Sequence, residues 1–413
     1  MIDAQWIAAR RAEFPFFTDS GQPPPAYLDN AATTLRPRVV ATALARACTD
    51  LTGNVHRATH HWSEETTMAY EAARAAVARW LGAAEPAEVL FTRNATESLN
   101  WVATGWGQAR GQPGARVLVT AQEHHSNLLP WRAALQRCGG ACLVAGVQPD
   151  GRVDPDQWHA ALAQQPQVVA FPLVSNVTGI VNPVAEWARA ARAAGALVVL
   201  DAAQGLIHHP PLALAASDFD FVVGSGHKLF GPPGIGFLWA RRAHLNWLPP
   251  PLLGGEMVAT VTATTAQWSE PPWRFEAGTP NIIGALGFAA ALDYLRGLDR
   301  DQRTNHLRAL TQYAQTALAA EPGVRLVGAR PESAGILAFT VEGIHPHDVA
   351  QFADAENVAI RAGRLCAQPY IEALGHESLC RASFQVYNDE SDIQRLLVGI
   401  RRARAFFLAE HKP

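Results

Sequence analysis

The chain has 413 residues, of which 48% are hydrophobic and 17% are charged, and its formal net charge at pH 7 is −3. This length allows a large core and two domains, while the small negative charge argues against a nucleic-acid-binding protein. No charged-then-apolar leader opens the sequence and no apolar run reaches the roughly 18 residues that span a bilayer, so we expect a cytoplasmic protein that binds no membrane.

The first eighty residues predict two helices and a short strand. A short helix is predicted around Ile2 to Glu13. Residues Tyr27 to Thr34 (YLDNAATT) predict a strand that runs into a loop, where the small side chain of Ala31 leaves room for a ligand; an ordinary turn is the alternative. Apolar residues at helical spacing predict an amphipathic helix over Met68 to Leu81.

Three histidines precede that helix, at His56, His60 and His61. They raise the question of a metal site, but no acidic or cysteine ligand set with matching spacing accompanies them. We therefore expect no metal, and place these histidines at the polar rim of a site or on the plain surface.

Strand Glu88 to Thr92 is followed by a polar loop, Arg93 to Ser98 (RNATES), and then by an apolar helical run from Leu99. This is a phosphate-binding layout, because helix N-terminal N–H groups and the Thr96 hydroxyl face the same point. The alternative is a simple helix cap made by Thr96 or Asn94, and one geometry serves both purposes.

Strands and helices continue to alternate up to about residue 236. Strand Arg116 to Thr120 ends in EHHSN, where a histidine can stack on a flat cofactor ring or be an ordinary loop residue. Further strands are predicted over Cys142 to Val147 and Gln167 to Pro172, and a helix over Val184 to Ala194. The alternation predicts a mostly parallel sheet covered by helices on both faces, with ligands bound just past the strand ends.

Two buried strands end in groups that suit pyridoxal phosphate. One ends in Asp201, and the next, Phe219 to Val223, is followed by a Gly/Pro-rich loop that holds Ser225, His227 and Lys228. Lysine is rare in this sequence, and a desolvated lysine has a lowered pKa and can form a Schiff base. Pyridoxal phosphate needs such a lysine, an acid at its pyridine nitrogen, a phosphate cup and packing on its ring. A structural loop lysine is the alternative.

The C-terminal part predicts a smaller α+β domain. Its expected elements are helices over Ile282 to Leu298, Gln302 to Ala320 and Asp389 to Leu408, and an alternating run over Gly335 to Val341. We expect a large domain over residues 21–290 and a small domain made of residues 291–413 together with residues 1–20.

Taken together, the motifs NVHR, NATES, EHHSN, SNVTG, DAAQ, SGHKLFGPPGIG, FEAGTPN, RAGRLCAQP and CRAS resemble the class V aminotransferase family. Within it they resemble cysteine desulfurases of the sulfur-mobilisation type, with selenocysteine lyases close by. The resemblance covers nearly the whole chain. It implies the pyridoxal-phosphate-dependent transferase fold of type I, with a mostly parallel seven-stranded sheet in the large domain and a smaller C-terminal α+β domain.

The resemblance also implies a role for each matching residue. Lys228 holds pyridoxal phosphate and moves protons, Asp201 pairs with the pyridine nitrogen, and His124 stacks on the ring. The other cofactor-binding residues are Gln204 at the phenolic oxygen and Ala95, Thr96, Ser225, His227 and a partner subunit's copy of Thr279 at the phosphate. Substrate-binding residues are Arg381 at the carboxylate, with Asn176, Arg361, Ala31 and His56.

By the same resemblance, Cys366 is the nucleophile. A lone cysteine is more often a small buried hydrophobe, but the loop RAGRLCAQP around Cys366 contains two arginines, and nearby positive charge favours the reactive thiolate. The family usually has two histidines directly before this cysteine, where this chain has Arg364 and Leu365. Our hypothesis is that Arg364 favours the thiolate or recruits an acidic sulfur acceptor. The odd number of cysteines, five, argues against a disulfide framework.

We therefore expect a homodimeric cysteine desulfurase that converts L-cysteine to L-alanine and passes the sulfur through a Cys366 persulfide to an acceptor protein. L-selenocysteine is an equally fitting substrate. One alternative is a pyridoxal-phosphate-dependent C–S lyase or another class V enzyme, in which Cys366 is dispensable. The second alternative is a protein that binds a partner and has no catalytic activity. The presence of both Lys228 and Asp201 argues against it.

Overall fold

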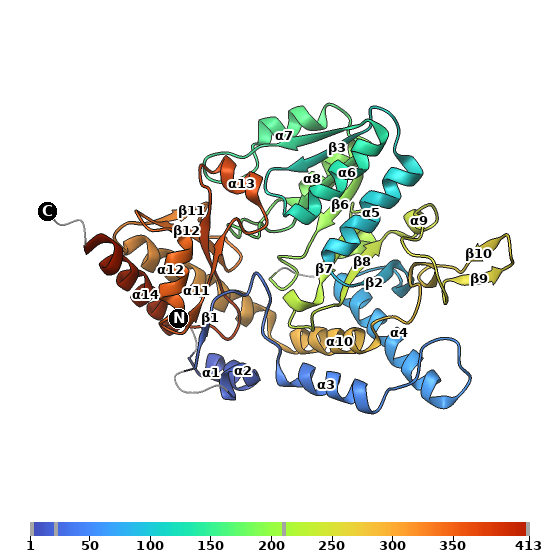
Figure 1. The fold of residues 1–413 in the computed structure, drawn as a ribbon, viewed down its shortest axis with the longest axis horizontal. Helices are drawn as coiled ribbons and strands as arrows, with labels where there is room; N and C mark the ends of the chain where they lie inside the picture. The colour runs from blue at the N-terminus through green and yellow to red at the C-terminus, as the bar shows by residue number, and fades with distance from the viewer. Residues whose placement is uncertain (1–3, 20–23, 209–211, 410–413) are drawn as a thin grey trace.

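The computed structural model describes residues 4–19, 24–208 and 212–409. Figure 1 shows a large body around a seven-stranded sheet and, beside it, a smaller body that carries the C-terminal helix α14 (Glu390–Ala409). Among the described residues, none of the helices combines the length and the apolar character that crossing a membrane requires.

The large sheet has the strand order β2-β8-β7-β6-β5-β3-β4. Strand β8 runs antiparallel to both of its neighbours, and all the other pairs are parallel, so the expected mostly parallel seven-stranded sheet is confirmed. The strands are β2 (Val89–Thr92), β3 (Arg116–Thr120), β4 (Ala141–Ala145), β5 (Val168–Pro172), β6 (Leu197–Asp201), β7 (Phe221–Ser225) and β8 (Gly236–Ala240).

Successive residues of each strand face opposite sides of the sheet and enter two separate cores. In β6, Val198 and Leu200 belong to one core and Val199 to the other. The second core lies under α5 (Ala95–Arg110) and α6 (Leu129–Cys138). The first lies under α4 (His61–Leu81), α7 (Pro155–Leu162), α8 (Val184–Ala193) and α10 (Ile282–Gly297), against which α3 (Arg38–Thr49) packs.

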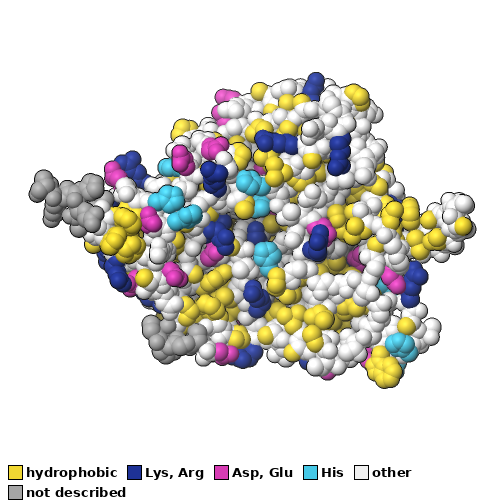
Figure 2. All heavy atoms as spheres, in the orientation of Figure 1, with side chains coloured by type: hydrophobic (Ala, Val, Ile, Leu, Met, Phe, Trp, Pro, Cys, Tyr) yellow, Lys and Arg dark blue, Asp and Glu magenta, His cyan; other side chains and the backbone are white. Residues whose placement is uncertain are grey.

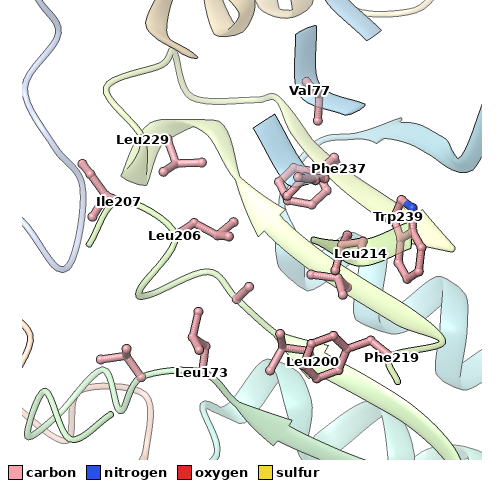
Figure 3. Close-up of a cluster of buried hydrophobic side chains, with 14 of the residues drawn as sticks. Val77, Leu173, Leu200, Leu206, Ile207, Leu214, Phe219, Leu229, Phe237 and Trp239 are labelled. Atoms are coloured by element: carbon pink, nitrogen blue, oxygen red, sulfur yellow. The ribbon is translucent and has the colours of Figure 1, made fainter. Parts of the chain in front are cut away.

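Figure 3 shows part of the first core, which includes Leu200, Phe237 and Trp239 of the sheet together with Leu206 and Leu229. Each of these side chains is at least nine-tenths buried. Burying one such side chain contributes roughly 1.5–3 kcal/mol. Because Leu229 directly follows Lys228, this packing anchors the lysine loop to the sheet.

The smaller body is an antiparallel sheet of order β11-β12-β15-β14 covered by helices. Its strands are β11 (Val324–Val327), β12 (Ile336–Val341), β14 (Arg361–Gly363) and β15 (Leu379–Ser383). Its helices are α11 (Arg300–Ala320), α12 (Pro346–Asp354), α13 (Gln368–Ala373) and α14. Away from both bodies, β9 (Val258–Val261) and β10 (Ala266–Trp268) form a hairpin that projects at the right of Figure 1.

The N-terminal segment touches both bodies. Helix α1 (Ala4–Ala12) leads through α2 (Pro15–Thr18) to β1 (Ala26–Tyr27), which pairs in parallel with β13 (Val358–Ala359) of the smaller body. Arg11 forms an ion pair with Asp392 of α14. The predicted division into residues 21–290 and 1–20 with 291–413 stays a prediction, and its boundary at residue 20 lies outside the described residues.

Phe14 is fully buried in an aromatic cluster that joins this segment to the lysine loop. Its ring lies 5.5 Å from that of Phe230, two residues beyond Lys228, and 4.6 Å from that of Tyr387. The ring of Tyr294, on α10, completes the cluster at 6.0 Å from that of Phe14. The beginning of the chain, the lysine loop and the C-terminal part therefore share one packed contact.

Most of the predicted elements are confirmed to within a few residues. Two helices begin earlier than expected, because polar side chains cap them ahead of their apolar stretch. Helix α4 begins at His61, since the His60 ring accepts a hydrogen bond from the Ser63 N–H, and α5 begins at Ala95 behind the Asn94 cap. The first predicted helix is found over Ala4–Ala12, and Ile2 lies outside the described residues.

Candidate active site

A cavity of about 400 Å³ lies at the carboxyl ends of β5, β6 and β7, and the smaller body closes one side of it. In Figure 2 basic and histidine side chains gather in the middle of the displayed face, between the region of α11 and α14 and the large sheet. Most of the predicted site residues line the cavity: Ala31, Ala95, Thr96, His124, Asn176, Asp201, Gln204, Ser225, His227, Lys228, Arg361, Cys366 and Arg381.

Lys228 ends a 3₁₀ turn, Gly226–Lys228, that follows β7. Glycine is required at the start of this turn, because a Cβ on Gly226 would lie 2.9 Å from the side chain of Ile235. The backbone oxygen of His227 accepts hydrogen bonds of 2.9 Å from both the N–H and the hydroxyl of Thr34. Burial lowers the pKa of Lys228 to about 8, although the negative charge of Asp201 acts in the opposite direction.

Asp201, the last residue of β6, places a buried carboxyl in the same cavity. Burial raises its pKa, while an N–H bond of 3.0 Å from Ala203 and the nearby Lys228 charge favour the ionised form. Gln204 follows on the next loop, and its side-chain amide donates to the Ala31 carbonyl at 2.6 Å. The amide thereby connects the loop after β6 to the YLDNAATT segment.

His124 is an uncharged ring in this setting. Burial and the Lys228 charge lower its pKa to about 4. Its Nδ1 accepts a hydrogen bond of 3.1 Å from the Ser126 N–H, so the ring proton of the neutral form is on Nε2. A neutral, oriented ring of this kind can lie flat against an aromatic cofactor.

Glu123 is a buried carboxyl that the sequence did not single out. It accepts hydrogen bonds from the Thr120 N–H at 3.1 Å, from the Thr120 hydroxyl at 2.7 Å and from the Asn127 amide at 2.7 Å. Burial nevertheless raises its pKa to about 8. Its position directly before His124, after a buried strand, was the signal that could have marked it. The bonds hold the EHHSN loop in shape beneath His124.

The N-terminus of α5 faces the cavity beside the end of β7. The cap is Asn94, whose side chain accepts from the Glu97 N–H at 2.9 Å, so of the two predicted caps it is Asn94 and not Thr96 that acts. The Ala95 N–H donates to Ser225 Oγ at 2.9 Å, and Thr96 Oγ1 lies 2.8 Å from the Ser126 hydroxyl. A first helical turn with hydroxyls around it suits a phosphate group.

Arg381 and Arg361 share one carboxylate, that of Asp29 in the YLDNAATT segment. Arg381 Nη2 lies 3.2 Å from Asp29 Oδ1, and Arg361 Nη2 lies 2.8 Å from Asp29 Oδ2. Arg381 Nη1 also donates to the Asn176 carbonyl at 2.8 Å, while its buried Nε has no hydrogen-bond partner in the described part of the chain. Arg381 is nonetheless one of the residues that line the cavity, and a guanidinium in a cavity is suited to a carboxylate ligand.

Cys366 lies at the cavity on a loop with unusual backbone angles. Leu365 and Cys366 both have positive φ, 48° and 53°, a conformation that costs non-glycine residues on the order of 1 kcal/mol or more each. Three bonds hold the loop: Asn176 Nδ2 to the Leu365 carbonyl at 2.8 Å, the His125 N–H to the Cys366 carbonyl at 2.7 Å, and the Gln368 N–H to His125 Nε2 at 3.1 Å. The thiol itself is on an exposed residue.

The side chain of Arg364 donates to Gln368 Oε1 at 3.3 Å on the exposed side of the loop. Arg364 is not among the described residues that line the cavity. The hypothesis that Arg364 favours the thiolate or recruits an acceptor stays a prediction.

Two predicted site residues lie outside the cavity of a single chain. His56 Nε2 is 2.9 Å from Glu71 Oε1 and borders another pocket together with Arg57 and Trp273. Thr279 is exposed and does not line the cavity either. No group of three or more His, Cys, Asp or Glu side chains that could hold a metal ion is found within the described ranges.

The lowered pKa of Lys228 gives a direct expectation for the cofactor-free protein. Only the unprotonated amine reacts with an amine-specific reagent, so labelling of Lys228 should rise about tenfold per pH unit up to pH 8 and then level off. Mass spectrometry of the labelled peptide measures this, with Lys412, the one other lysine of the sequence, as the reference in the same sample. A Lys228 profile that still rises at pH 10 contradicts the expectation.

Comparison with known proteins gives consistent findings. The family model for class V aminotransferases matches residues 26–396. A protein of Streptomyces coelicolor named a probable cysteine desulfurase is 42% identical over 92% of this chain and 92% of its own length. The crystal structure of the cysteine desulfurase CsdA from Escherichia coli aligns with a TM-score of 0.89 at 36% identity, covering 97% of this chain and 99% of that one. A cysteine desulfurase from Thermococcus onnurineus aligns with a TM-score of 0.91 at 34% identity, covering 98% and 100%.

Proposed function

This chain belongs to the class V aminotransferase family and within it to the cysteine desulfurases, and we propose that it uses pyridoxal phosphate to convert L-cysteine to L-alanine, with the sulfur transferred to Cys366. One observation supports this most strongly. Lys228, Asp201 and Cys366 come from three distant parts of the chain and line a single cavity.

The residues of the cavity fit pyridoxal phosphate. The amine of Lys228 has a lowered pKa, Asp201 offers a buried carboxylate to a pyridine nitrogen, and His124 offers a neutral ring. The first turn of α5, with Thr96 and the Ser225 hydroxyl, can hold the phosphate. When bound, this cofactor withdraws electrons from the substrate Cα and makes its proton acidic.

The residues of this chain then carry out the remaining steps. Arg381, whose guanidinium lines the cavity, binds the substrate carboxylate, and the Lys228 amine takes the Cα proton as general base. The Cys366 thiolate attacks the substrate sulfur: a sulfur–sulfur bond forms and the bond from sulfur to Cβ breaks. The electron pair stays with the carbon skeleton, which takes up protons and leaves as alanine. The enzyme keeps a persulfide.

The assembly and the acceptor are parts of the same proposal. Thr279 and His56 lie outside their own cavity, which agrees with a homodimer in which Thr279 contributes to the neighbour's phosphate site. The exposed Cys366 can hand its sulfur to an acceptor protein, and we place the enzyme in the cytoplasm. L-selenocysteine fits the same cavity, because the attack on selenium needs the same groups.

The test is a product analysis of the cofactor-loaded protein with L-cysteine. We expect alanine and enzyme-bound persulfide in equal amounts in a first turnover without reductant, because one sulfur leaves with each alanine formed. Pyruvate and ammonia in place of alanine would show the C–S lyase alternative. A parallel incubation with L-selenocysteine measures which chalcogen is preferred.

A further inference from the structure

A second cavity, of about 150 Å³, lies away from the proposed active site, between helix α11 and the loop 331–335. Val181 and His208, from the large body, also line it. Liquid water occupies roughly 30 Å³ per molecule, so this space holds several waters or one small ion. The lining is more basic than acidic, with Arg303 and Arg308 on one wall.

Arg303 is the unusual member of this lining. Only 3% of the residue is exposed, and its Nε and Nη1 atoms are buried without a hydrogen-bond partner in the described part of the chain. The neighbouring charge that acts on it is that of Arg300, which has the same sign, and burial together with that charge lowers the pKa of Arg303. A buried guanidinium without a partner is strongly unfavourable, so its retention here calls for a negative ligand.

The surrounding groups define which ligand fits. Thr304 supplies a hydroxyl to the lining, and Arg308 places a second guanidinium on an exposed residue at the mouth. Glu332 is the one carboxylate among the described lining residues, and it too is exposed. A buried positive charge therefore adjoins the inner part of the cavity, while the one negative charge among the described lining residues is on an exposed side chain.

We propose that this cavity is a binding site for a small tetrahedral oxyanion of the phosphate or sulfate class, held by the charge of Arg303 from within, by Thr304 and by Arg308 at the mouth. The charge of the Arg303 guanidinium attracts such an ion, and the ion's oxygens can accept hydrogen bonds from the Thr304 hydroxyl and the second guanidinium. The site is separate from the phosphate position of the cofactor, which lies at the N-terminus of α5.

The test compares the cofactor-loaded wild type with Arg303→Met, so that the cofactor occupies the phosphate position in both. In chloride buffer the variant should melt at the higher temperature, because a buried unpaired charge has been removed. Added inorganic phosphate, at constant ionic strength, should raise the melting temperature of the wild type by more than that of the variant. Calorimetry should show at least about tenfold weaker phosphate binding by the variant. Equal phosphate-dependent shifts in the two proteins overturn the assignment.

A second variant keeps the proposal testable even if Arg303→Met folds poorly. Glu332→Gln removes the carboxylate at the rim and should tighten phosphate binding by about threefold, as for other exposed charges. Unchanged binding by Glu332→Gln counts against the site. Sulfate, like phosphate, should raise the melting temperature of the wild type by more than that of Arg303→Met, whereas acetate should raise both equally. A difference between the two proteins that appears with acetate alone overturns the tetrahedral class of ligand.

Discussion

Replacing Lys228 with alanine is expected to lower the rate of alanine formation from L-cysteine by about 10³-fold or more. In the proposed mechanism, the change removes the amine that takes the Cα proton and, with it, the group that would tether the cofactor. Among the described residues that line the cavity, Lys228 is the one lysine, and the sequence contains one other, Lys412. The measurement is the initial rate of alanine formation, together with the visible absorbance of the protein after gel filtration, which should lose the band of the lysine-bound cofactor.

Lys412→Ala is the matched control, because it removes the other amine of the chain and should leave both the rate and the absorbance unchanged. Lys228→Arg extends the test: it keeps the positive charge near Asp201 but supplies no reactive amine. A Lys228→Ala protein that still turns over at more than a tenth of the wild-type rate contradicts the role of this lysine.

Replacing Cys366 with alanine should abolish the enzyme persulfide and reduce alanine formation on the order of 10⁴-fold, as the removal of other enzyme nucleophiles does. The reason is that Cys366 is the one cysteine among the described residues that line the cavity, so the substrate sulfur then meets no thiol there. The loop should keep its shape, since it is held by backbone groups of Leu365, Cys366 and Gln368, which the substitution leaves in place. Persulfide is measured by alkylation and mass spectrometry, and alanine by chromatography.

Cys48→Ala serves as the control, because Cys48 is also exposed but does not line the cavity. Its persulfide yield and rate should equal those of the wild type. Continued release of pyruvate and sulfide by Cys366→Ala at the wild-type rate would instead favour the C–S lyase reading, in which this thiol is dispensable.

Much of the large body was predictable from local sequence. Runs such as those of β6 and β7 are short, apolar and followed by a polar residue, so both the strands and the position of Asp201 and Lys228 at their ends could be derived. The motif resemblance then supplied the remaining candidates. The structure brings most of them into one cavity, although their individual roles stay proposals.

The features that the sequence did not predict depend on contacts between residues far apart in the chain, which no local sequence pattern contains. Asp29 is more than three hundred residues from Arg361 and Arg381 in the sequence, yet it lies between both guanidinium groups. The left-handed backbone of Cys366 is set by bonds from Asn176 and His125, which belong to other loops. Strand β8 runs antiparallel to β7, from which the lysine loop, residues 226–235, leads to it, and spacing alone did not reveal this direction.

The aromatic cluster around Phe14 has a practical consequence for anyone who handles this protein. Fusion partners, affinity tags and deletions are usually placed at an N-terminus on the assumption that it is inert. Here the ring of the fourteenth residue is wedged against Phe230, on the segment that carries the reactive amine. A deletion that reaches Phe14 would therefore remove a packing contact of the segment that holds Lys228.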